Sequence, residues 1–111
     1  MFKLIHNHNC SKSRDCKKIL EQKKIKFELI EYSKNKLSMS QISEIISKIF
    51  EVDSILRTNE KNFKLNKRDL SNKKELIKFL HDNQNCIQRP IFFDGMKYHV
   101  CRPPEKVNEL L

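Results

Sequence analysis

Residues 2–14, FKLIHNHNCSKSR, decide the fold of this chain. The apolar run at 2–6 predicts a buried strand, a polar loop follows, and apolar residues at helical spacing predict a helix from Ser13 to about Lys24. Residues 25–32 alternate imperfectly and predict a second strand. Strand, helix and strand within about thirty residues indicate a βαβ unit, whose strands pair in parallel through a right-handed crossover.

The stretch also carries a candidate nucleophile, Cys10, which stands where the helix begins. Ser11 and Ser13 are residue types that cap helices, and Arg14 places a fixed positive charge in the first turn. A helix N-terminus with nearby cations favours the thiolate, which is the nucleophilic form of cysteine. The sequence therefore predicts an activated cysteine that faces an anion.

The middle of the chain is expected to be helical. Ser38 and Gln41 form a capping-box pattern ahead of isoleucines at helical spacing, and Asn72 and Glu75 form a second one. A less regular stretch lies between these two predicted helices, at about residues 52–66.

The C-terminal part predicts a hairpin and a last helix. Asp94-Gly95 separates two apolar runs, which favours a two-residue turn, and Pro103-Pro104 opens the final helix. The order βαβ, helical insert, ββα is that of a thioredoxin-like α/β fold with a mixed four-stranded sheet. We expect a single domain over residues 1–111, without linker or repeat.

The charge of the chain, formally +9, comes mostly from lysine. Eighteen of the 23 basic residues are lysines, there is no alanine, and Asn and Ile are abundant, as is typical of an AT-rich genome. Solvated lysines therefore explain the charge better than a nucleic-acid surface does. We expect no specific nucleic-acid partner and a monomer.

No apolar run approaches the roughly 18 residues that a membrane span needs, and no secretory signal is recognised, so we expect no membrane contact and a cytoplasmic location. In that reducing compartment the cysteines are expected to be free rather than paired. Cys16 is expected in the core and Cys86 in a loop. Cys101 either resolves Cys10 or, as we favour, is a small buried apolar residue.

Four separated motifs resemble the glutaredoxin-dependent arsenate reductase family, in its short bacterial branch. The resemblance runs from about residue 3 to 111, and its motifs are His6-Asn7-x-x-Cys10-Ser-Lys-Ser-Arg14, Leu56-Arg57, Arg89-Pro90-Ile91 and Cys101-Arg102-Pro103-Pro104. It implies that Cys10 attacks arsenate to form a thiol–arsenate ester. Glutathione, as co-substrate, then joins the arsenic, and glutaredoxin resolves the adduct to release arsenite, with no bound cofactor.

The resemblance also assigns residues. Arg57, Arg89 and Arg102 match the arginines that bind the oxyanion, and His6 matches a histidine that supports the thiolate. Pro90 matches the cis-proline that faces the active cysteine, a bond type that is almost confined to proline. Elementary chemistry agrees, because the planar fork of arginine binds tetrahedral oxyanions through paired hydrogen bonds. Ser13 and Arg14 are left as supporting residues.

The chain departs from the family pattern at His8, where the family usually has proline. Proline would stiffen the loop that presents the cysteine. The change also creates His6-x-His8-x-Cys10, whose alternation could place three metal ligands on one side of the loop. We favour no metal site.

Two functional classes stay open. The first is the monothiol arsenate reductase. The second is a non-enzymatic, redox-linked interaction protein related to regulators that bind RNA polymerase. Those regulators usually carry Cys-x-x-Cys at the helix start, whereas this chain has Cys10-x-x-Ser13, which counts against a dithiol switch.

Overall fold

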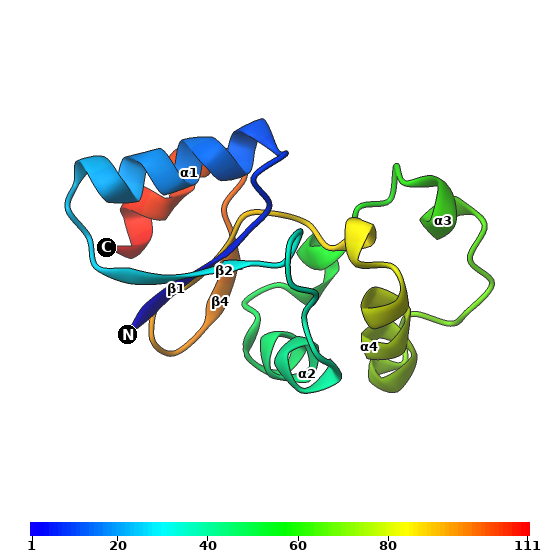
Figure 1. Ribbon diagram of the computed structural model, residues 1–111. Helices are drawn as coiled ribbons and strands as arrows, with labels where there is room; N and C mark the ends of the chain where they lie inside the picture. The colour runs from blue at the N-terminus through cyan, green and yellow to red at the C-terminus, as the bar shows by residue number, and fades with distance from the viewer. The chain divides into compact units, whose positions relative to one another are not determined.

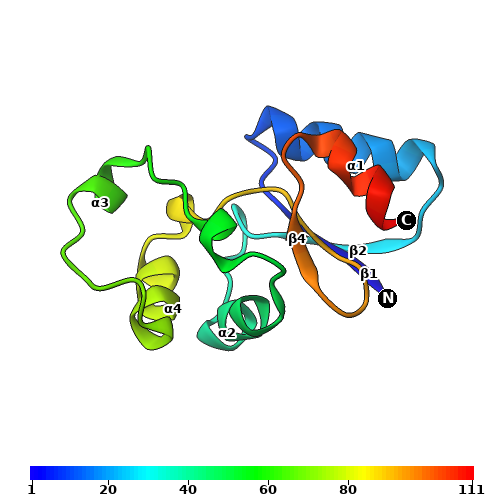
Figure 2. The ribbon, with the colours of Figure 1, turned by 180° about the vertical axis from the view of Figure 1, so that it is seen from behind.

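The computed structural model describes residues 1–111, and the chain forms two compact units (Figure 1 and Figure 2). Unit 1 comprises Met1–Lys36 and Arg89–Leu111, and unit 2 comprises Leu37–Gln88. The single domain over 1–111 stays a prediction. No helix in either unit combines the length and the apolar character that crossing a membrane requires.

Unit 1 is built on a mixed four-stranded sheet, as the sequence predicted. Its strand order is β2-β1-β3-β4, and the strands are β1 (Phe2–His6), β2 (Phe27–Glu31), β3 (Ile91–Phe93) and β4 (Tyr98–Val100). β1 pairs in parallel with β2, whereas β1–β3 and β3–β4 are antiparallel. The thioredoxin-like fold class, with the insert falling between β2 and β3 in the chain, is thereby confirmed.

Helix α1 (Ser11–Gln22) crosses from β1 to β2 and buries one face. It ends two residues earlier than the pattern suggested, because Lys24 adopts a positive φ of 56°. The N–H of Ile25 then donates to the carbonyl of Leu20 at 3.0 Å, a bond that closes helices of this type.

The core of unit 1 lies between the sheet, α1 and the C-terminal segment. That segment is a 3₁₀ helix, η3 (Pro104–Leu110), rather than the α-helix expected after Pro103-Pro104, and it packs beside α1 (Figure 1 and Figure 2). The fully buried residues of this core come from both ends of the chain: Leu4, Cys16, Leu20, Phe92, Cys101 and Val107. Their burial packs the middle and the C-terminal half of α1 against β1, β3 and the segment after β4.

The hairpin between β3 and β4 turns one residue later than predicted. The N–H of Asp94 donates to the carbonyl of Lys97 at 3.0 Å, so the two central residues are Gly95 and Met96. The physical reason is that the Asp94 carboxylate accepts the N–H groups of Met96 and Lys97, both at 2.8 Å, and so folds the turn around itself. Gly95 takes the left-handed conformation, with φ of 102°.

Unit 2 is helical, as expected of the insert. Its elements are α2 (Met39–Lys48), η1 (Val52–Ile55), α3 (Lys61–Lys64), α4 (Lys73–Asp82) and η2 (Gln84–Cys86). The Ser38–Gln41 capping box is confirmed in both of its hydrogen bonds. The second capping box is only half formed. The Asn72 side chain accepts the N–H of Glu75, but the N–H of Asn72 donates to the carbonyl of Asp69 instead of to the Glu75 side chain.

The side chain of Gln84 joins η2 to the backbone of Leu37 inside unit 2. Gln84 is 9% exposed, and its side-chain amide accepts the N–H of Leu37 at 2.9 Å and donates to the carbonyl of Leu37 at 2.8 Å. The amide therefore satisfies both backbone groups of a buried residue, as a neighbouring strand would.

We predict that Gln84→Ala lowers the free energy of unfolding by about 1–3 kcal/mol, because both backbone groups of Leu37 lose their partner. Urea unfolding followed by circular dichroism measures the change. The matched control is Gln22→Ala at an exposed position, which should stay within about 0.5 kcal/mol of wild type. A Q84A variant as stable as the control would contradict this role.

Candidate active site

Cys10 is the N-cap of α1, directly after the loop that leaves β1. Its N–H donates to the carbonyl of Asn7 and its carbonyl accepts the N–H of Arg14, each at 3.0 Å. The expectation that Ser11 or Ser13 caps this helix is wrong. No side chain caps it, and the first free N–H groups of α1 are left to face the sulfur.

Four hydrogen-bond donors surround the Cys10 sulfur. Burial by itself raises the pKa of the Cys10 thiol, but hydrogen bonds from the Ser13 N–H, from the Arg89 and Arg102 side chains and from the Lys12 N–H outweigh it. The pKa of Cys10 is therefore below its ordinary value. The thiol is also partly exposed, so it combines the two properties of a reactive cysteine.

Arg102 connects the far end of the chain to this sulfur. Its Nη1 lies 3.8 Å from Cys10 Sγ and also donates to the carbonyl of Arg89 at 2.8 Å. Both arginines precede prolines, and the Arg89–Pro90 and Arg102–Pro103 bonds are cis. The carbonyl of Pro90 accepts the N–H of Cys101 at 2.9 Å, which joins the two arginine-bearing segments.

His6 does not touch the sulfur but acts on the residue beside it. It is 2% exposed, and its Nδ1 lies 2.7 Å from the Ser13 hydroxyl, which also accepts the N–H of Asn7 at 3.1 Å. Burial lowers the pKa of His6, and the Glu31 carboxylate opposes this shift only in part. A neutral imidazole therefore holds Ser13, whose N–H faces Cys10.

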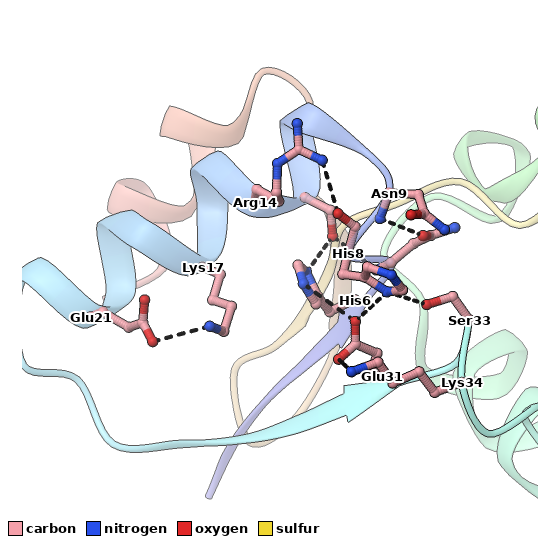
Figure 3. Close-up of polar contacts among 11 residues, drawn as sticks. His6, His8, Asn9, Arg14, Lys17, Glu21, Glu31, Ser33 and Lys34 are labelled. Carbon is pink, nitrogen blue, oxygen red and sulfur yellow. Dashed lines mark hydrogen bonds and ion pairs between the residues drawn. The ribbon is translucent and has the colours of Figure 1, made fainter.

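Arg14 lies on the outside of the loop. Its Nη1 donates to the carbonyl of His8 at 2.8 Å (Figure 3). No hydrogen bond joins Arg14 to the Cys10 sulfur, so the contact places Arg14 as a support of the loop.

Arg57 belongs to unit 2, where its guanidinium is engaged. Its Nε lies 3.3 Å from the Glu60 carboxylate, and its Nη1 donates to the side chain of Gln88 at 2.8 Å. Its backbone N–H donates to the carbonyl of Cys86 at 2.8 Å. These partners hold Arg57 in one orientation; neither Glu60 nor Gln88 was singled out in the sequence.

The remaining cysteines are buried. Cys16 lies in the core as predicted, and Cys101 packs in the same cluster, as a small apolar residue would. The hydrogen bond with Cys101, together with burial, raises the pKa of the Cys16 thiol. Cys86 was expected in a loop but lies in η2 with 0% exposure, because its thiol donates to the side chain of Asn62 at 3.3 Å.

The alternation His6-x-His8-x-Cys10 does not produce a metal centre in the structure. No group of three His, Cys, Asp or Glu side chains is placed to hold a metal ion. The two imidazoles instead lie beside Glu31, with His8 Nδ1 at 2.7 Å and His6 Nε2 at 4.0 Å from Glu31 Oε1.

A partly exposed cysteine at a helix N-terminus, with an arginine on its sulfur, here belongs to a protein of the thioredoxin-like fold class. The chain belongs to the ArsC family, whose profile matches residues 5–110.

Relatives and solved structures of this family match the chain over nearly its whole length. An arsenate reductase of Haemophilus influenzae is 35% identical, over 97% of both chains. An Escherichia coli protein named only as the uncharacterized protein YfgD is 32% identical, over 98% of this chain and 95% of its own. The structure of an arsenate reductase from Vibrio cholerae is similar with a TM-score of 0.86 and 26% identity, covering 99% of this chain and 97% of that one.

We predict that Arg102→Ala slows alkylation of Cys10 by iodoacetamide at neutral pH about three- to tenfold, because a cationic donor to the thiolate is lost and the thiolate pKa rises. The pH profile of the rate, followed by intact mass, measures the shift toward higher pH.

The matched control is Lys18→Ala, which removes the same charge from an exposed position on α1. It should leave the profile in place, since exposed charges are screened. An equal shift in both variants would show that net charge, and not the contact with Sγ, sets the reactivity.

Proposed function

We propose that this protein reduces arsenate to arsenite, with Cys10 as the nucleophile and glutathione and glutaredoxin as the source of electrons. The observation that carries the proposal is the contact of 3.8 Å between Arg102 Nη1 and the Cys10 sulfur, at the open N-terminus of α1. The positive charge of Arg102 and the N–H groups of the helix N-terminus favour the thiolate and also attract a tetrahedral oxyanion. Membership of the ArsC family, with a relative named as an arsenate reductase, supports the choice of oxyanion.

The chemistry needs one cysteine and two further thiol equivalents. The Cys10 thiolate attacks arsenate, and an oxygen leaves as water to give a thiol–arsenate ester. A glutathione thiol then joins the arsenic, and a second oxygen leaves as water. A glutaredoxin thiolate attacks the glutathione sulfur to form a mixed disulfide, and the electron pair of the broken S–As bond reduces As(V) to As(III). Water then cleaves the remaining bond between Cys10 and arsenic, which releases arsenite and frees Cys10. Overall, arsenate and two thiols give arsenite, one disulfide and water.

Three arginines are proposed to bind the oxyanion: Arg57, Arg89 and Arg102. Arg89 and Arg102 already donate to the sulfur that the arsenic will meet. Arg57 is held by Glu60 and Gln88 in unit 2, so its guanidinium is ordered before substrate arrives. His6 and Ser13 complete the proposed site by orienting the N–H groups at the helix start.

The interaction-protein alternative gains nothing from these observations. Cys10 has a serine, not a cysteine, at the position three residues on, and the relatives reported above do not favour a transcription regulator.

We predict that Cys10→Ser abolishes arsenite formation in the presence of glutathione, glutaredoxin, glutathione reductase and NADPH, because the hydroxyl is not ionised near neutral pH. The matched control is Cys86→Ser in unit 2, which keeps a hydrogen-bond donor toward Asn62 and should retain activity within about twofold. Arsenite is measured directly, with NADPH oxidation as the second readout.

The same assay distinguishes the electron donor. Replacing glutathione and glutaredoxin by thioredoxin and its reductase should leave only background turnover. Turnover with thioredoxin alone would overturn the proposed donor but not the reductase. No arsenite with either donor would overturn the activity.

A further inference from the structure

A cluster of polar side chains, among them His8, Glu31 and Ser33, lies between the loop after β1 and the end of β2 (Figure 3). His8 is in the loop, Glu31 is the last residue of β2, and Ser33 lies two residues beyond it. His8 Nδ1 is 2.7 Å from Glu31 Oε1 and 3.0 Å from the Ser33 hydroxyl. The side chain of His8 therefore ties the loop to the end of β2.

Glu31 needs this contact. Its side chain is 18% exposed, and Oε1 is buried without a hydrogen bond of regular geometry. The nearest groups that can compensate its charge are the two imidazoles, His8 at 2.7 Å and His6 at 4.0 Å, while Lys34 reaches only the other oxygen at 3.9 Å. A buried carboxylate oxygen is costly without a partner, so Glu31 and His8 hold each other.

The loop is held on its other side by α1. Arg14 Nη1 donates to the carbonyl of His8 at 2.8 Å, so the backbone of His8 is fixed by the helix and its side chain by the sheet. Two further bonds close the loop onto Asn7, whose carbonyl accepts the N–H of Cys10 at 3.0 Å and whose side chain accepts the N–H of Asn9 at 2.9 Å. His8 is thus the anchor of the segment that ends in the nucleophile.

We propose that His8 and Glu31 are positioning residues for Cys10. Their pair restrains residues 7–10 so that the sulfur stays against the Ser13 N–H and the Arg102 guanidinium, the contacts that stabilise the thiolate. Without the pair the loop gains conformational freedom, and the sulfur spends less time at its donors. The inference rests on the proposed function for its meaning in catalysis, but thiolate reactivity tests it without arsenate.

The sign of the effect separates positioning from simple electrostatics. Removing a carboxylate near a thiol stabilises the thiolate if charge alone acts, and alkylation then becomes faster. Loss of positioning makes alkylation slower and moves its pH profile upward. Glu31→Ala therefore gives opposite results under the two explanations.

The experiment measures alkylation of Cys10 by iodoacetamide against pH in the full chain. We expect Glu31→Ala and His8→Ala each to slow the reaction about three- to tenfold at neutral pH. The double variant should be no slower than the slower single one, because both changes remove the same contact. His8→Asn, whose amide nitrogen can take the place of Nδ1 and still donate to Glu31, should keep the rate within about twofold of wild type.

Two controls and an internal check accompany these variants. Glu28→Ala removes an exposed carboxylate from the same strand, and Lys34→Ala removes the lysine that pairs with the other carboxylate oxygen of Glu31; both should behave as wild type. Intact mass should show one label, because Cys16, Cys86 and Cys101 are buried in a folded chain. If Glu31→Ala shows more labels, Glu31→Gln and His8→Ala carry the test.

Faster or unchanged alkylation in Glu31→Ala and His8→Ala overturns the positioning role, as does additive slowing in the double variant. Because arsenate takes no part, this result is independent of the reductase assay. If the wild type fails to reduce arsenate but the variants show the expected alkylation rates, the proposed function is overturned and the positioning role stands.

Discussion

The contact between the Cys10 sulfur and its hydrogen-bond donors is the interaction on which the site depends. The sulfur is partly buried, which opposes ionisation, and it is stabilised by two backbone N–H groups of α1 together with Arg89 and Arg102. The donors come from opposite ends of the chain. Only the sheet, in which β1 lies between β2 and β3, brings the start of α1 and the segment after β4 to one place.

Around this contact, unit 1 buries polar groups that a simple core would not contain. His6 and Ser13 are 2% and 0% exposed, and each finds its partner in the other. Beyond them, Glu31 and His8 link the loop to β2. These contacts join the loop that carries Cys10 to β2 and to the first turn of α1. Because Glu31 in β2 contacts the loop that carries Cys10, we expect a substitution in β2 to alter the reactivity of the Cys10 sulfur.

The fold and the position of Cys10 at a helix start could be predicted from sequence because both rest on local patterns. The role of Cys10 as the nucleophile stays a prediction. Periodicity located the strands and helices of the βαβ unit, and a cysteine at a helix start has a physical meaning wherever it occurs. Arg89 and Arg102 required the family resemblance, since no spacing rule connects them with Cys10. Glu31 was missed because its role depends on the end of β2, which lies far from the loop in sequence.

The remaining differences between prediction and structure have a common cause. In each case a side chain or a neighbouring carbonyl forms a hydrogen bond that the predicted turn or helix cap did not include. Asp94 moved the hairpin turn by one residue by accepting two N–H groups, and Asp69 took the bond that would have completed the capping box at Asn72. Ser13 looked like a helix cap but bonds His6 instead. In each case two hydrogen-bond partners compete for one group, and a sequence pattern names the candidates without deciding between them.

The account is tested most directly by the ionisation of Cys10 in the wild-type protein. The thiolate is followed by its ultraviolet absorbance as the pH is raised, and the titration of Cys10→Ser is subtracted to remove the other groups. We expect the Cys10 pKa to lie below the ordinary value of a cysteine thiol, since hydrogen-bond donors to the sulfur outweigh its burial. A midpoint at or above that value would show that burial dominates, and would contradict the claim that this site activates its cysteine.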